Sequence, residues 1–71
     1  MNTIEYLNQS KHYMVCRNLV QIDTLVHRIG IALSDQEVDW QGIAGEANRI
    51  KNLAGDVVNL AIDITDRKGQ P

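Results

Sequence analysis

The sequence predicts an all-α fold in which a short N-terminal helix precedes an antiparallel helical hairpin. Apolar residues recur at steps of three and four from Val15 to Leu33 and again from Ile43 to Ile64, and no stretch alternates as a strand would. The single proline is Pro71, so proline interrupts no helix before that point. Aromatic residues make up only 4% of the chain and phenylalanine is absent, so Ala, Val, Ile and Leu must form the core. Together these observations favour helices that pack through aliphatic side chains.

The first helix is expected to span about residues 3–9. Asn2, followed three residues later by Glu5, fits a capping box, and Ile4 and Leu7 would point inward. Residues 8–12 are polar and interrupt the apolar pattern, and Ser10 is a suitable cap for a following helix. A break is therefore expected between the first helix and the second.

The second helix is expected over about 11–33, followed by a loop over about 34–39. Asp39 as N-cap would place Val38 and Ile43 at the two positions of a hydrophobic staple, although Ser34 with Glu37 is a rival capping box. The apolar seam of this helix has a regular four-three spacing. Its residues are Val15, Leu19, Ile22, Val26, Ile29 and Leu33.

The last helix is expected over about 40–67, ending where Arg67 and Lys68 precede Gly69. Alanine at every seventh position would let the two long helices approach closely, with small side chains facing large ones. A loop this short favours antiparallel neighbours. The expected seam consists of Ile43, Ala47, Ile50, Ala54, Val57, Ala61 and Ile64.

Association into a homo-oligomeric helix bundle is expected for this single domain of residues 1–71. The apolar arc of each long helix is wider than one neighbour can cover, because Leu53 and Leu60 flank one seam and Val20 and Ile31 lie behind the other. A chain of 71 residues also has a small core. The alternative is a monomer whose first helix completes a three-helix core.

Composition narrows the classes of function. Cys16 is the only cysteine, so no intrachain disulfide can form, and a cytoplasmic location is expected. No segment has the length and apolarity of a membrane span, so no membrane partner is expected. The formal net charge of −2 provides no general attraction to nucleic acid, and nucleic-acid binding is not expected.

Side chains able to carry chemistry are few. His12 with Cys16, and Asp23 with His27, form two pairs at i,i+4 spacing, but they are two helical turns apart and neither pair alone satisfies a zinc ion. The Asp23 and His27 pair also has no nucleophile at catalytic spacing. We therefore expect no catalytic residues, no metal, no cofactor and no enzymatic activity.

The leading hypothesis is a small, non-enzymatic, oligomeric helical protein that binds another protein as a regulator or inhibitor. Tryptophan is enriched among residues that dominate binding energy, and large aliphatic residues beyond the seam are the other natural contacts. The candidate partner-binding residues are Trp40, Leu53, Leu60, Val20 and Ile31.

The alternative is sequestration of a small anionic nucleotide, such as a cyclic nucleotide, between subunits. Cations and two tyrosines gather near the start of the second helix, where free amides and stacking would favour an anion with a base. The candidate ligand-binding residues are Tyr6, Lys11, His12, Tyr13, Arg17 and Arg28.

Two architectural resemblances bear on these hypotheses. The alternation of alanine with large residues, as at Ala47 and Ile50, resembles the layers of the small plasmid copy-number hairpin, which dimerises into a four-helix bundle and binds RNA loops. The polar ridge that contains Arg17 and Arg28 has few cations, so an RNA-binding hairpin is the least favoured function. A short helix before a hairpin is similar in outline to small oligomeric phage proteins that sequester cyclic nucleotide signals, which implies the second hypothesis.

Overall fold

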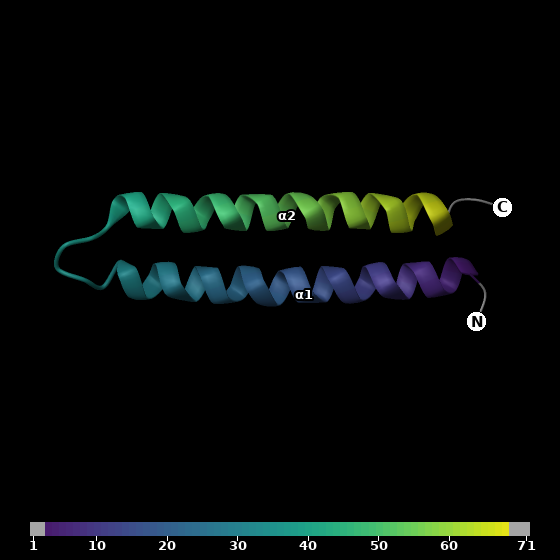
Figure 1. Cartoon of the computed structure of the whole chain (residues 1–71), viewed down its shortest axis with the longest axis horizontal. Helices are drawn as coiled ribbons and strands as arrows, with labels where there is room; N and C mark the ends of the chain where they lie inside the picture. Colours follow the sequence, from purple (N-terminus) through teal and green to yellow (C-terminus); the bar gives the residue numbers. More distant parts are fainter. Residues whose placement is uncertain (1–2, 69–71) are drawn as a thin grey trace.

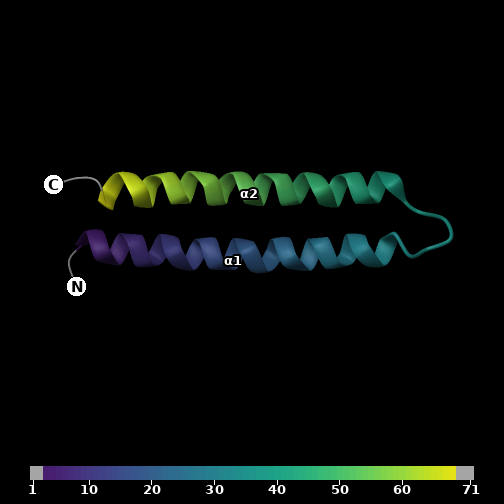
Figure 2. The same ribbon diagram turned by 180° about the vertical axis from the view of Figure 1, so that it is seen from behind.

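Two long helices packed against each other make up the computed structural model, which describes residues 3–68 and the side chains of residues 9–66. Helix α1 spans Thr3–Ala32 and helix α2 spans Trp40–Lys68. The helices lie side by side along their length, and the start of α1 and the end of α2 lie at the same end of the molecule (Figures 1 and 2). The Cα atoms extend over 57 × 17 × 11 Å. The prediction of an all-helical chain is confirmed for the described residues.

The predicted break between residues 8 and 12 is wrong, because α1 continues through this segment as one helix from Thr3 to Ala32. No glycine or proline lies between residues 3 and 29, and polar residues such as Ser10 and Lys11 tolerate a helix interior. The Lys11 ammonium lies 2.8 Å from the Asp63 carboxylate of α2, which ties this part of α1 to its neighbour. The predicted capping box of Asn2 and Glu5 and the side chains of Ile4 and Leu7 lie outside the described residues.

The start of α2 is capped as the sequence predicts. The Asp39 carboxylate accepts a hydrogen bond of 3.0 Å from the backbone N–H of Gly42, and the Asp39 carbonyl accepts one of 3.0 Å from Ile43. A Cβ atom at Gly42 would lie 2.5 Å from a carboxylate oxygen of Asp39, so glycine leaves room for the cap. The rival cap, Ser34, instead donates a hydrogen bond of 3.3 Å to the Gly30 carbonyl at the end of α1. The expected stop at Arg67, Lys68 and Gly69 lies outside the residues whose side chains are described.

The contact between the helices is made by two rows of half-buried or buried side chains on each helix, with members seven residues apart. We name each row after one member. On α1 the Leu25 row is Lys11, Asn18, Leu25 and Ala32, and the Ile22 row is Val15, Ile22 and Ile29. On α2 the Leu53 row is Glu46, Leu53 and Leu60, and the Ile50 row is Ile43, Ile50, Val57 and Ile64.

One half of each predicted seam is therefore correct and the other half is wrong. The Ile22 and Ile50 rows lie between the helices as predicted. The other predicted members of both seams are exposed, because each helix is turned about its axis so that leucines face the neighbouring helix in their place. The exposed members are Leu19 and Val26 on α1, Leu33 just beyond its end, and Ala47, Ala54 and Ala61 on α2.

Replacing the cap residue should destabilise the fold. We expect Asp39→Ala to lower the free energy of unfolding by about 1 kcal/mol, because the Gly42 N–H loses its acceptor at the positive end of α2. Urea denaturation followed by circular dichroism at one fixed protein concentration measures the change. Asp35→Ala, which removes the same charge from the loop but no cap, should change the stability by less than half as much. Equal losses in the two variants would contradict the role of the cap.

Candidate functional site

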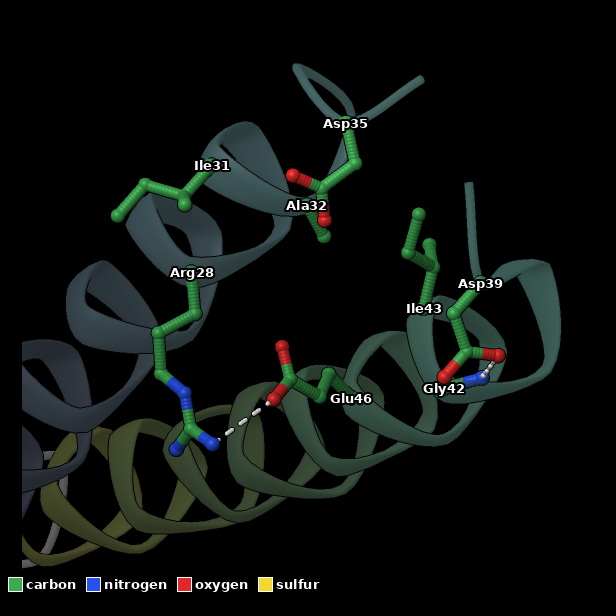
Figure 3. A pocket seen from close by; sticks show the side chains of 8 residues that line it. All are labelled: Arg28, Ile31, Ala32, Asp35, Asp39, Gly42, Ile43 and Glu46. Carbon is green, nitrogen blue, oxygen red and sulfur yellow. Dashed lines mark hydrogen bonds and ion pairs between the residues drawn. The ribbon is translucent and has the colours of Figure 1, made fainter. Parts of the chain in front are cut away.

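A hollow between the two helices lies near the connecting loop. It has a volume of about 350 Å³ and is lined by both helices and the loop. The Arg28 guanidinium reaches across it to the Glu46 carboxylate at 3.1 Å, and Asp39 turns toward Gly42 at its rim (Figure 3). Its lining includes Asp35, Asp39 and Glu46 but only one cation, Arg28. Because its lining holds three carboxylates and only one guanidinium, the hollow is unsuited to an anionic ligand.

The polar members of the Leu25 row contact α2 directly. Lys11 is only 19% exposed, and its ammonium pairs with Asp63, whose side chain is 54% exposed. The Asn18 side-chain amide donates a long hydrogen bond of 3.5 Å to the Leu53 carbonyl. An ion pair with a partner as exposed as Asp63 contributes little stability, at most about 1 kcal/mol. The main effect of these polar contacts is to fix which residues of the two helices lie at the same level.

Sequence reasoning missed the partners in these contacts: Asn18, Glu46 and Asp63. The available signal was that Lys11, Asn18, Leu25 and Ala32 recur at steps of seven. Two of the four members are polar, so hydropathy conceals this row and favours the fully apolar one that contains Leu19. Only the structure shows that α2 supplies polar partners for it.

The structure disperses the candidate anion-binding residues. Lys11 and Arg28 both take part in ion pairs with α2, and they are about 25 Å apart along α1 at 1.5 Å per residue. Tyr13 and Arg17 line one shallow hollow on the outer side of α1. His12 is exposed, but it precedes Tyr13 by one residue and so lies about 100° around the helix from it. The side chain of Tyr6 lies outside the described residues.

The candidate partner-binding residues fall into two groups. Val20, Ile31 and Trp40 are 67%, 58% and 66% exposed and are open to a partner. Leu53 and Leu60 are half-buried in the contact with α1. A partner would therefore meet the first three residues without displacing α1, whereas Leu53 and Leu60 contribute first to the contact between the helices.

A row of exposed apolar side chains follows the outer side of α1. Tyr13 and Val20 are seven residues apart, and Ile31 is eleven further on, so all three lie within about 20° of each other on the helix. All three are more than half exposed. These three residues define the outer row, and two of them also line hollows that reach α2: Ile31 beside Glu46, and Val20 beside Arg49.

The predicted pairs of chemically capable side chains are exposed on α1. His12, Cys16, Asp23 and His27 are all open to solvent, and Cys16 is a free thiol. Within the part of the chain that the structure describes, no group of three or more His, Cys, Asp or Glu side chains is placed to hold a metal ion. No described helix combines the length and apolarity needed to cross a membrane.

Comparison with models of protein families, with curated proteins and with solved structures finds no match to this chain.

Proposed function

We propose that the two helices form an antiparallel hairpin and that the chain works as a non-enzymatic homo-oligomer that binds another protein as a regulator or inhibitor. One observation carries the proposal that the chain forms a homo-oligomer. Leu25, at 4% exposure, is the only hydrophobic side chain that is buried among the described residues, whereas ten large hydrophobic side chains are exposed. Burial of apolar surface is the main force that stabilises a fold, so a helix pair with this core needs further burial. A second copy of the chain can supply this burial.

The outer row supports the second part, binding of a different protein. Tyr13, Val20 and Ile31 share one side of α1, and each is more than half exposed. Exposed apolar residues gathered on one face, rather than scattered singly, are typical of interaction surfaces. Arg17 lies beside Tyr13 and Val20 in the same shallow hollow, and tyrosine and arginine are both enriched among residues that dominate binding energy.

Nucleotide sequestration has less support. Lys11 and Arg28 already pair with carboxylates, and the hollow near the loop is lined by three acidic side chains. A ligand phosphate would have to displace Asp63 or Glu46 before it reached either cation. We also propose a cytoplasmic location, because the exposed thiol of Cys16 stays reduced most readily in a reducing compartment.

Sedimentation equilibrium tests the oligomer. We expect a molar mass that is a multiple of the 8.0 kDa chain mass at micromolar concentration, since the exposed apolar side chains favour association. Dilution should shift the mass toward that of one chain as the equilibrium constant requires. A folded species of 8.0 kDa that is independent of concentration would contradict the proposal.

Variant-dependent capture tests partner binding through the outer row. The tagged protein is used to capture a partner from cell extract, the partner is identified by mass spectrometry, and binding is repeated with both proteins purified. We expect Val20→Glu to weaken that binding at least about tenfold, because it places a charge in an apolar contact.

Asn52→Glu, at an exposed position on α2, is the matched control and should bind as the original chain does. Equal affinity for the Val20→Glu and Asn52→Glu variants would remove the outer row from the interface. Release of a nucleotide when the native protein is heated would favour the sequestration alternative instead.

A further inference from the structure

We infer that the second copy covers the face of the helix pair formed by Leu19, Val26, Leu33, Ala47, Ala54 and Ala61, and that α1 of each copy packs against α2 of the other. We call this surface the leucine-alanine face. The inference rests on the homo-oligomer proposed above and specifies which surface forms it and in which arrangement. It also explains why the sequence pattern favoured these six residues as a seam although α1 and α2 of one chain do not bury them.

The ion pairs show that the six residues share one side of the molecule. Arg28 follows Leu25 by three residues and so lies beside the Leu25 row, and it pairs with Glu46 of the Leu53 row. These two rows therefore lie toward the same side of the helix pair, and the Ile22 and Ile50 rows lie toward the other. Each leucine or valine of the face follows a member of the Ile22 row by four residues, and each alanine follows a member of the Ile50 row by four. Both sets therefore lie on the side away from the Arg28–Glu46 pair.

The accessible surface of the helix pair is larger than that of a compact folded monomer of the same mass. The accessible surface is 5607 Å². A compact folded monomer of 8.0 kDa exposes about 4,450 Å², so the excess is roughly 1,150 Å². A stable interface buries about 800 Å² on each partner. The excess is thus larger than the area that one partner buries in a stable dimer interface.

Side-chain size indicates which helices meet. Lys11 and Asp63 lie at the same height along the helix axes, and so do Arg28 and Glu46. Counting residues from these two ion pairs places Leu19 at about the height of Ala54. The same count places Val26 at about the height of Ala47. A twofold axis parallel to the helices brings α1 against α2 of the partner copy at these same levels. Leu19 then faces the partner's Ala54 and Val26 faces the partner's Ala47. A large residue meets a small one at both levels, so the layers fill evenly.

Charge at the rim of the face agrees with this arrangement. Asp23 follows Leu19 by four residues and Lys51 follows Ala47 by four, so each lies at the outer edge of its stripe. Asp23 is twelve residues after Lys11 and Lys51 is twelve before Asp63, so the two are level with each other. Packing α1 against the partner's α2 therefore places Asp23 beside the partner's Lys51. Opposite charges meet twice, once on each side of the dimer.

The other twofold arrangement, with α1 on α1 and α2 on α2, is less favourable. It would pack the leucine stripe against another leucine stripe and the alanine stripe against another alanine stripe, leaving layers of unequal thickness. It would also place both Asp23 carboxylates along one seam and both Lys51 ammonium groups along the other. Like charges on one seam oppose association.

Cysteine cross-linking distinguishes these arrangements. Two full-length variants carry Asp23→Cys or Lys51→Cys, each together with Cys16→Ser so that only one thiol is present. They are mixed in denaturant, refolded together and treated with a short bis-maleimide, and the products are identified by mass spectrometry. Random pairing of the two variants would give a fixed ratio of mixed dimer to homodimers. We expect the ratio among the cross-linked products to exceed that value at least about fivefold in favour of the mixed Asp23→Cys/Lys51→Cys dimer. The same reagent on each variant alone is the control.

Each other outcome overturns a defined part of the account. Predominant homodimers would overturn the packing of α1 against the partner's α2 while leaving the oligomer in place. A multiple of 8.0 kDa by sedimentation with no cross-linked product would move the interface away from the leucine-alanine face. A single-chain mass for the original protein and both variants would overturn the proposed oligomer together with this inference.

Discussion

Two helices that touch along one line can bury only a narrow strip of side chains, and this limit governs the rest of the structure. Each helix presents two rows to its neighbour, but Leu25 is the only buried hydrophobic side chain among the described residues, because the two helices cover each other along one line only. Single-chain burial therefore leaves the helix pair short of the apolar area on which folds depend. In the proposed oligomer, a second copy would supply a second layer of small and aliphatic side chains, which would compensate for the lack of aromatic ones.

Polar contacts give the helix pair two different sides. Lys11, Arg28 and their carboxylate partners lie toward one side, and the leucine-alanine face lies toward the other. Polar residues in an otherwise apolar seam, such as Asn18 and Glu46, favour one register at some cost in stability. The pairs that fix the level of the helices in one chain thereby also fix which residues two copies can present to each other. In the proposed dimer, the register of the two helices within one chain would therefore determine how two copies pack.

Local patterns in the sequence predicted the helical class, the loop and the Asp39 cap, because these depend on neighbouring residues. The sequence could not decide how far each helix turns about its axis. Leu19 and Leu25 both fit a three-four spacing, and the choice between them depends on what α2 offers opposite, which no local pattern contains. The break expected near Ser10 failed for a similar reason, since Lys11 finds its partner 52 residues away. Of the candidate site residues, Val20, Ile31 and Trp40 are open to a partner, whereas Leu53 and Leu60 contribute to the contact with α1.

The central claim is that folding and association of this chain are one equilibrium. The most direct measurement is the urea midpoint of helix loss, followed by circular dichroism over a hundredfold range of protein concentration. The account predicts that the midpoint rises steadily with concentration, because association stabilises the folded state by mass action. A midpoint that stays constant over the whole range would contradict it, since the helix pair would then be stable as a single chain.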